Sequence, residues 1–482
     1  MPFQPVLLWS DLLIWLLVLA GVASAWLSAR KPMLRSAWRR VAGNRAGMAS
    51  ATVLAAYLVV GLLDSLHYRP RLESREPVSA AKPGPQAPVY AVEVLSLLDF
   101  LLTPLRTQIE KTYSEPLATR AYAKEAIEIR DTEGKVRQTR DFPRLKYGGA
   151  HLGDDEAARA VDIGRQLLSA LAMAVLAWCA VAAVTTALLA GAADCSQREA
   201  WRRIWRDDTG FAWNAVLAAA AVLLLLLVPL ATLAGDYHVL GTDKVGQDVL
   251  YQILKSVRTA LVIGLVTTLV MLPVAIVLGV IAGYFRGWVD DLIQYLYTTL
   301  SSIPGVLLIA AAVLMIRVLI DTHPQWFVTA AERADLRLLA LCFILGLTSW
   351  TGLCRLLRGE TLKLRELEYV QAARAFGVAD LRIISRHILP NLMHLVIIAL
   401  VMDFSSLVLA EAVLSYVGIG VDPTMISFGT MINNARMELA REPMVWWSLS
   451  AAFVFMFVLV LAANLFADAV RDAFDPRLAG AA

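Results

Sequence analysis

The stretch Glu368-Tyr-Val-Gln-Ala-Ala-Arg-Ala-Phe-Gly377 lies between two long apolar segments and is followed thirteen residues later by Pro390. Most of its side chains are small or polar, so it does not continue the apolar segments on either side. A water-exposed segment held between two such segments presents a surface that another protein can contact. The stretch therefore predicts a membrane protein with a docking element outside the bilayer.

The docking element is predicted to be a helix, a turn and a second helix. The first helix covers 366–377, and Gly377 ends it because glycine readily adopts the left-handed conformation found at helix C-termini. The second helix begins near Asp380, a residue type favoured at N-caps, and Pro390 separates it from the next span because proline has no amide hydrogen. The apolar positions at helical spacing are Val370, Ala373 and Phe376 in the first helix and Leu381, Ile384 and Ile388 in the second.

Composition places most of the chain in a membrane. Of its 482 residues, 58% are hydrophobic and the mean hydropathy is +0.61, whereas soluble domains are about 45–50% apolar. The excess lies in runs of roughly 20 residues, the length of a helix that crosses hydrocarbon. Lipid cannot satisfy backbone hydrogen bonds, so the predicted fold class is an all-α polytopic membrane protein. The nine predicted spans are 6–28, 47–66, 165–192, 211–234, 260–283, 292–316, 337–356, 392–417 and 446–467.

Basic residues in the short loops predict the orientation. They gather in the loops after the first, third and seventh spans, which places those loops in the cytoplasm, the N-terminus outside and the C-terminus inside. The long polar segment 67–162 is then external, and we interpret it as a small cap or docking surface. The basic residues of the three loops are Arg30, Lys31, Arg35, Arg39, Arg40 and Arg45; Arg198, Arg202, Arg203 and Arg206; and Arg355, Arg358, Lys363, Arg365, Arg374, Arg382 and Arg386.

The helix pair also has the outline of a DNA-binding helix–turn–helix, with basic residues on its second helix. Such a unit needs at least one more helix, and the roughly 35 residues between the two spans leave no room for it. The sequence therefore argues against nucleic-acid binding. Nor does it predict a metal site, because the cysteines show no paired metal spacing and are expected to be ordinary core residues. They are Cys179, Cys195, Cys342 and Cys354.

Spacing within the docking element resembles a known family. Gln371-Ala-Ala373, Gly377 and Leu389-Pro390 are similar to the EAA loop of binding-protein-dependent ABC importer permeases. Gln371 stands where that pattern often has glutamate, and His387 stands where it has isoleucine. Both departures resemble the peptide/nickel branch of the family.

Three further blocks resemble the same branch, in the same order along about the C-terminal 270 residues. Gly241-Thr-Asp-Lys-Val-Gly-Gln-Asp-Val-Leu250 is similar to its periplasmic Gly-Thr-Asp block, although Gln247 stands where arginine is usual. Glu411-Ala-Val-Leu-Ser-Tyr-Val-Gly-Ile-Gly420 resembles the end of its fifth core helix. Asp468-Ala-Val-Arg-Asp-Ala-Phe-Asp-Pro-Arg-Leu478 resembles its C-terminal tail.

The resemblance implies the type I ABC importer transmembrane fold, with a six-span permease core in residues 194–482. Within it, the transmembrane type-1 domain would cover about 257–470 and the cytoplasmic EAA coupling loop 366–390. Residues 1–193 would be an N-terminal extension with three spans and the external segment 67–162.

The resemblance also implies the C-type permease subunit of an importer in the bacterial inner membrane. Its partners would be a second, B-type permease, two ABC ATPase subunits, a periplasmic substrate-binding protein and the lipid bilayer. This chain has no Gly-x-x-x-x-Gly-Lys-[Ser/Thr] string to hold nucleotide phosphates, so we expect no cofactor on it, with ATP and Mg on the partner ATPases. Peptides are the expected substrates on family frequency; dipeptides, oligopeptides, antimicrobial peptides and nickel chelates stay open.

Three groups of residues are predicted to carry the function. A short helix seated in the ATPase subunits would move with them as a rigid body when they close on ATP. Asp403 lies within a span, where a charge costs about 2.5–3.5 kcal/mol, so it either lines the pathway or bonds to a neighbouring helix. The groups are Glu368, Gln371, Ala372, Ala373, Arg374, Gly377, Leu389 and Pro390 for ATPase coupling; Pro304, Asp403, Ser406, Glu411 and Ser415 for the pathway; and Gly241, Thr242, Asp243 and Asp248 in the periplasmic block.

Two alternatives remain at the level of sequence. One is a membrane-anchored enzyme that uses 67–162 as its catalytic domain, although that segment has only His67 and His151 and no recognisable catalytic or metal-binding arrangement. The other is a membrane scaffold with an inert loop. Pro304, inside the predicted span 292–316, is expected to kink it, which suits either a gate or a static helix.

Overall fold

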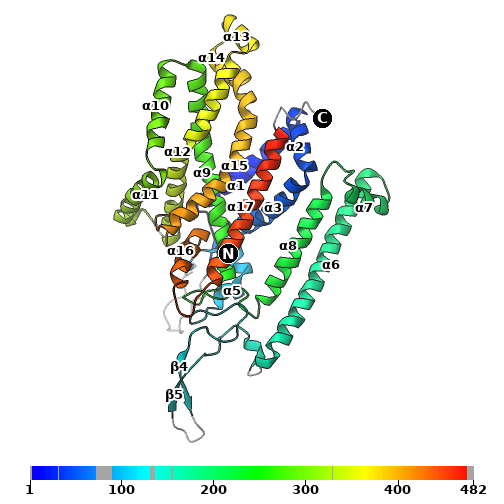
Figure 1. The fold of residues 1–482 in the computed structure, drawn as a ribbon, viewed down its shortest axis with the longest axis vertical. Helices are drawn as coiled ribbons and strands as arrows, with labels where there is room; N and C mark the ends of the chain where they lie inside the picture. The colour runs from blue at the N-terminus through cyan, green and yellow to red at the C-terminus, as the bar shows by residue number, and fades with distance from the viewer. Residues whose placement is uncertain are drawn as a thin grey trace, which may run out of the picture.

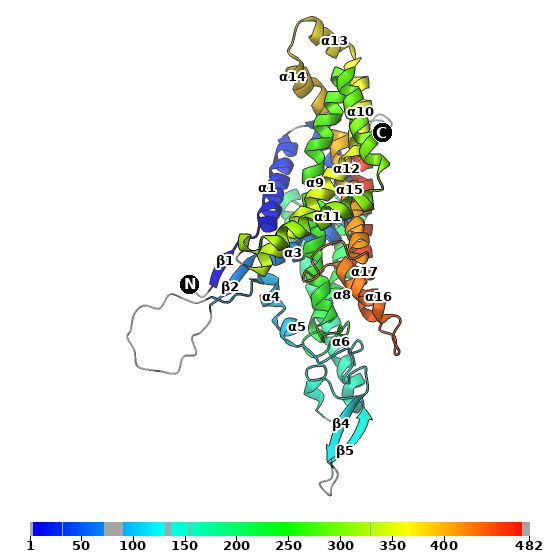
Figure 2. The ribbon, with the colours of Figure 1, turned by 90° about the vertical axis from the view of Figure 1, so that its left-hand side faces the viewer.

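The protein is a long bundle of helices (Figure 1), with the short helices α13 and α14 at one end and the hairpin of strands β4 and β5 at the other (Figure 2). The computed structural model describes residues 3–30, 32–71, 90–130, 136–153, 156–327 and 329–474. The C-terminal tail block therefore lies partly outside the described residues.

Eight helical runs within the described residues are long and apolar enough to cross a membrane. The first predicted span corresponds to α1 (Trp9–Arg30), whose apolar part is the shorter stretch Trp9–Ala23. The eight runs are α3 (Arg45–Asp64), α6 (Arg159–Ala193), α8 (Trp213–Leu233), α9 (Val249–Phe285), α11 (Gly305–Thr322), α12 (Ala330–Arg365), the run Asp380–Tyr416 that ends in α15 (Leu389–Tyr416), and α17 (Trp447–Phe474).

The single predicted span over 292–316 is wrong, because two helices occupy that region. Helix α10 (Trp288–Ser302) ends before Pro304, and α11 begins after it. A proline drives the residue before it out of the helical region, and Ile303 accordingly has extended backbone, with φ of −86° and ψ of 131°. Pro304 therefore breaks the helix instead of kinking it. Helix α10 runs along the bundle, whereas α11 crosses it (Figures 1 and 2).

The centre of the bundle is the pair α9 and α12, which share the most extensive contact in the molecule. Small residues let the two helices approach closely, as is usual in membrane proteins. A Cβ added at Gly279 of α9 would lie 2.8 Å from the carbonyl oxygen of Cys354, and one added at Gly283 would lie 2.7 Å from that of Arg358. Helices α3, α15 and α17 pack around α9.

Helices α6 and α8 form a hairpin on one side of the bundle (Figure 1). Helix α6 packs on α8, and α8 packs on α3, whereas α3 itself packs on α9 and α17. The packing thus does not follow the predicted division at residue 193. Helix α3, which precedes residue 193, lies against the centre, whereas α8, which follows it, lies outside α3. The division stays a prediction.

Short elements cap both ends of the bundle. Strands β1 (Phe3–Val6), β2 (His67–Pro70) and β3 (Leu95–Ser96) form an antiparallel sheet in that order, and β4 (Glu125–Arg130) pairs with β5 (Val136–Asp141). The short helices are α2 (Pro32–Gly43), α4 (Leu97–Leu101), α5 (Thr103–Thr107), α7 (Gln197–Arg206), α13 (Glu368–Ala375), α14 (Asp380–Ile383) and α16 (Phe428–Glu438), with single turns at Ala150–Leu152, Glu156–Ala158 and Pro324–Trp326.

Candidate functional site

The EAA-like loop, residues 366–390, forms α13 and α14 at one end of the bundle. Gly377 has a φ of +75° and ends α13 as predicted. Its N–H donates to the carbonyl of Arg374 (3.0 Å), and the N–H of Val378 donates to that of Ala373 (3.1 Å). These two bonds form the Schellman motif, in which glycine supplies the left-handed residue.

The loop has one buried face and one exposed face. Val370 and Ile383 are 2% and 0% exposed, and they join a hydrophobic cluster with α9, α10, α12 and the start of α15. Phe376 and Leu381 are 87% and 78% exposed. The predicted apolar stripes are therefore wrong at these two positions, since each points away from the cluster that holds the rest of its stripe.

Polar contacts also fix the second helix to the bundle. Tyr284 Oη donates to Asp380 Oδ1 (2.6 Å), and Arg365 Nη1 donates to the carbonyl of Tyr284 (2.7 Å). Asp380 was predicted as the N-cap, but Ala379 holds that position without a side-chain bond. Asp380 instead uses its carboxylate to tie α14 to the end of α9.

Pro390 does not separate α14 from the next span as predicted. The path is helical from Asp380 to Tyr416, with a π-helical turn at Ile384–Ile388 before α15 begins at Leu389. Pro390 is the second residue of α15 and directly follows this π-helical turn, so its missing amide hydrogen falls where the hydrogen-bond pattern of the helix changes. The wider turn keeps the loop continuous with the span.

The predicted coupling residues lie mostly on the surface of this loop. Gln371 Nε2 donates to the carbonyl of Glu366 (3.2 Å), close to the ion pair between Glu366 and Arg286. The role of the predicted coupling residues in ATPase coupling stays a prediction. The exposed members are Glu368, Gln371, Ala372, Arg374, Gly377 and Pro390, while Ala373 and Leu389 are half-buried.

The Gly-Thr-Asp block, residues 241–250, lies at the other end of the bundle and is mostly buried, with Lys244 and Val245 exposed. Gly241 has a φ of +72°, and an added Cβ would lie 2.5 Å from the carbonyl oxygen of Ser114. Thr242 is fully buried and accepts a bond from the N–H of Ser114 (2.7 Å). The carbonyl of Thr242 accepts from Trp447 Nε1 (3.0 Å). The block therefore ties the segment 67–162 to α17.

The two aspartates of this block organise its backbone. Asp243 Oδ1 accepts from the N–H of Gln247 (2.8 Å), and Oδ2 accepts from Gln252 Nε2 (2.6 Å). Asp248 is the N-cap of α9, where its Oδ1 accepts from the N–H of Leu250 (2.8 Å).

A buried histidine joins this block to the segment 67–162. His238 Nδ1 lies 2.8 Å from Asp248 Oδ2, and its Nε2 lies 3.5 Å from Glu110 Oε1. Burial alone would lower the pKa of His238, but the hydrogen bond to Asp248 and the nearby carboxylate of Glu110 raise that pKa to about 9. Burial would likewise raise the pKa of Glu110, but His238 and the backbone N–H groups of 146–148 lower it to about 2.

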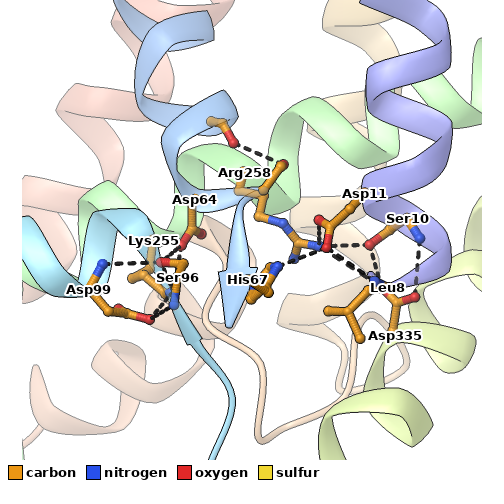
Figure 3. Close-up of polar contacts among 12 residues, drawn as sticks. Leu8, Ser10, Asp11, Asp64, His67, Ser96, Asp99, Lys255, Arg258 and Asp335 are labelled. Carbon is orange, nitrogen blue, oxygen red and sulfur yellow. Dashed lines mark hydrogen bonds and ion pairs between the residues drawn. The ribbon is translucent and has the colours of Figure 1, made fainter. Parts of the chain in front are cut away.

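Sequence reasoning missed a buried cluster around Arg258 of α9 (Figure 3). Arg258 Nη2 donates to Asp11 Oδ1 and to Ser10 Oγ, both at 2.7 Å. His67 Nδ1 lies 2.7 Å from Asp11 Oδ2, and the N–H of Ser10 donates to Asp335 Oδ2 (3.1 Å). The cluster joins α1, β2, α9 and α12.

A second cluster lies one turn earlier on α9, around Lys255 (Figure 3). Lys255 Nζ lies 2.5 Å from Asp64 Oδ1 and 3.1 Å from Asp99 Oδ2. Ser96 Oγ donates to Asp64 Oδ1 (2.6 Å), and Tyr251 Oη donates to Asp99 Oδ1 (2.8 Å). The sequence does carry a signal for the two clusters. Lys255 and Arg258 lie three residues apart at one end of a span, and acidic residues lie at the matching ends of other spans.

The structure does not bring all the predicted pathway residues together. Glu411 and Ser415 are buried and bonded to each other (2.6 Å), and Ser427 Oγ donates to the same Glu411 oxygen (3.0 Å). Asp403 and Ser406 lie on another face of α15, where Asp403 is partly exposed and Ser406 is exposed. Pro304 lies at the break between α10 and α11. A pathway role stays a prediction that peptide uptake by an Asp403→Leu variant would test.

Comparison with known proteins decides the family. Residues 275–480 match the family described as "Binding-protein-dependent transport system inner membrane component". The chain is 32% identical over 306 residues to the glutathione transport system permease protein GsiD of Pectobacterium atrosepticum, an alignment that covers 59% of this chain and 94% of that protein. The chain belongs to this family. The resemblance of its motifs is thereby confirmed.

Other relatives agree. The chain is 33% identical over 242 residues to the oligopeptide transport system permease protein OppC of Mycobacterium tuberculosis, covering 50% of this chain and 77% of that protein. It is 26% identical over 302 residues to the dipeptide transport system permease protein DppC of Bacillus subtilis, covering 58% and 86%. The chain is therefore a multi-pass transport permease with the type I importer fold, and the enzyme alternative has no support.

Proposed function

We propose that this permease imports peptides or peptide-like solutes and that its EAA-like loop couples it to cytosolic ATPase subunits. The exposure of Phe376 and Leu381 is the observation that supports coupling best. Both are large apolar side chains on a loop whose other face is held by Val370, Ile383 and the bond between Asp380 and Tyr284. A partner that covers the two side chains would move α13 and α14, and the buried face would pass that movement to α9, α12 and α15 as a rigid body.

The proposed assembly pairs this C-type chain with a B-type permease, two ATPase subunits that bind ATP and Mg, and a periplasmic substrate-binding protein. The loop end faces the cytoplasm, the N-terminus lies outside and the C-terminus inside. Relatives named for glutathione, oligopeptide and dipeptide transport support a peptide-like substrate. The binding protein would select among peptides.

Gly377→Arg tests the coupling role. An arginine at this position projects from the exposed loop into the space that the ATPase would fill. We expect the variant to reach the membrane at the wild-type level, while peptide uptake by the reconstituted complex falls at least tenfold and ATP hydrolysis no longer responds to loaded binding protein. Uptake of a dipeptide, an oligopeptide and glutathione by the same complex addresses the substrate.

Gly418→Arg is the matched control. Gly418 also has a positive φ (+85°), and an added Cβ meets nothing within 4 Å there either, but it follows α15 at the other end of that span. Both variants therefore carry a similar backbone strain. Normal uptake in the Gly377→Arg variant, or an equal loss in both variants, would count against ATPase docking at this loop.

A further inference from the structure

Helix α7, between α6 and α8, has a buried face, an aromatic ridge, a basic face and a fourth side that carries an ion pair. Ala200 and Ile204 are 3% and 0% exposed, and Ile204 belongs to a hydrophobic cluster with Ala182 of α6 and Leu217 of α8. Trp201 and Trp205 follow these two positions by one residue each, so they form a ridge beside the buried face. Their rings pack edge to face, with centroids 5.7 Å apart.

The third face is a stripe of arginines. Arg198, Arg202 and Arg206 are spaced four residues apart, and all three are exposed. At 100° per residue the stripe lies next to the tryptophan ridge on the side away from the buried face. No ion pair holds any of the three within the part of the chain that the structure describes, whereas Arg203 pairs with Glu199 (2.7 Å) on the remaining side.

Helix α7 lies at the end of the α6–α8 hairpin that faces the same way as the EAA-like loop, although the loop extends farther (Figure 1). The linker after it is bound to the last turn of α2 and to the first residue of α3. The N–H of Ala212 donates to the carbonyl of Ala42 (2.8 Å), and Arg45 Nε lies 2.9 Å from Asp207 Oδ2. The position of α7 is thus set by the bundle.

Helix α7 lies at one end of an apolar span. It packs on α6, whose outward side chains are apolar, as at Val184 (58% exposed) and Leu188 (69%). A span of this composition must place that surface in hydrocarbon, so a helix packed on its end lies at the boundary between lipid and water. Tryptophan is enriched at that boundary, and arginine near it attracts anionic head groups.

We propose that α7 is an interfacial anchor that binds phospholipids with anionic head groups. In this arrangement Trp201 and Trp205 lie at head-group depth, and Arg198, Arg202 and Arg206 contact the lipid phosphates. The proposal rests on the orientation proposed above, which places α7 at the cytoplasmic leaflet, where anionic lipid gives a negative surface potential. It gives the α6–α8 hairpin a role separate from transport itself.

The test measures lipid affinity of the full chain. Purified protein would be loaded with phosphatidylglycerol or phosphatidylcholine, and the bound lipids counted by native mass spectrometry across a concentration series. Each arginine near an anionic surface contributes about 1 kcal/mol, so Arg198→Gln/Arg202→Gln/Arg206→Gln should weaken phosphatidylglycerol binding roughly 100-fold at this site and leave phosphatidylcholine binding unchanged.

The charge-preserving triple Arg198→Lys/Arg202→Lys/Arg206→Lys is the matched control and should keep most of the phosphatidylglycerol affinity. Brominated phosphatidylglycerol should quench less fluorescence in Trp201→Phe/Trp205→Phe than in wild-type protein. The proposal would be overturned if the variant with three glutamines kept the wild-type affinity for phosphatidylglycerol. It would also be overturned if that variant lost binding of a cytosolic protein while its lipid affinity stayed intact. Because lipid counting needs no transport, a failure here is distinguishable from a failure of the coupling test.

Discussion

The EAA-like loop and the Gly-Thr-Asp block lie at opposite ends of the same bundle and use glycine in opposite ways. Gly377 and Gly246 have nearly the same φ, +75° and +76°. An added Cβ at Gly377 meets nothing within 4 Å, whereas at Gly246 it would lie 1.9 Å from the carbonyl oxygen of Glu110. One motif is open for a partner to approach, and the other is filled by the protein itself. Similarity to a family motif therefore does not say whether its residues serve contact or internal packing.

The largest difference is expected between Gly246→Ala and Gly377→Ala. Both place a side chain at positive φ, which costs about 1–2 kcal/mol. Only Gly246→Ala adds a clash with backbone, and overpacking costs a further 1–3 kcal/mol or so. We expect losses in the free energy of unfolding of about 4 kcal/mol and about 1 kcal/mol, measured by thermal unfolding in detergent. Equal losses would remove the contrast between the two motifs.

A second pair of substitutions sharpens the contrast within the loop. Ile383→Ala removes a fully buried side chain, which should cost about 3 kcal/mol. Phe376→Ala removes an exposed one and should change stability by less than about 0.5 kcal/mol. Peptide uptake should nevertheless fall in Phe376→Ala, because its side chain belongs to the proposed ATPase contact. Normal uptake with normal stability would leave Phe376 without a function.

The smallest expected effect is the pH dependence of the Gly-Thr-Asp end. The pKa of His238 is raised from 6.5 to about 9, so its charge stabilises the fold fully below pH 6.5, and this stability is lost as pH rises through 9. Because one pKa unit corresponds to about 1.4 kcal/mol and relaxation reduces the effect, we expect a loss of about 2 kcal/mol. The pKa of Glu110 is lowered to about 2, so its contribution is present above pH 4.5 and lost as pH falls through 2.

Thermal unfolding of wild-type protein and His238→Gln between pH 6 and 9.5 measures this effect. The variant should lose the decline in stability over that interval, although it starts from a lower value. The loop provides the internal comparison, because ATPase co-purification should not change with the His238→Gln substitution. An identical pH profile in the two proteins would mean that His238 is uncharged in the fold.

The spans and the family motifs could be predicted because each depends on neighbouring residues along the chain. Hydrophobic runs locate helices, and Gly377 ends α13 through a backbone conformation that glycine alone adopts readily. The errors in the predicted helix boundaries occur at prolines, because proline can interrupt a helix or be accommodated within one. Pro304 lies at the break between two helices and Pro390 lies within a continuous helical run, whereas the sequence predicts a kink at the first and a separation at the second. Pro229 and Pro273 show that these membrane helices also accommodate proline in their interiors.

Contacts between distant segments could not be predicted from the pattern. Hydropathy marks α3 and α8 equally as spans, but only α3 packs on α9. The partners of Lys255 and Arg258 come from residues as distant in the chain as Asp11, Asp64 and Asp335, and no periodicity relates them. Such placements depend on the three-dimensional fit of whole helices.

The cations on α9 limit how far this protein can be shortened. Removing α1 and α3 to obtain a minimal transporter would delete Asp11 and Asp64 and leave Arg258 and Lys255 buried with fewer counter-charges. An unmatched buried charge costs about 3–5 kcal/mol, a large fraction of the stability of an ordinary fold. A truncation engineered for expression or crystallisation would therefore need neutral residues at both positions.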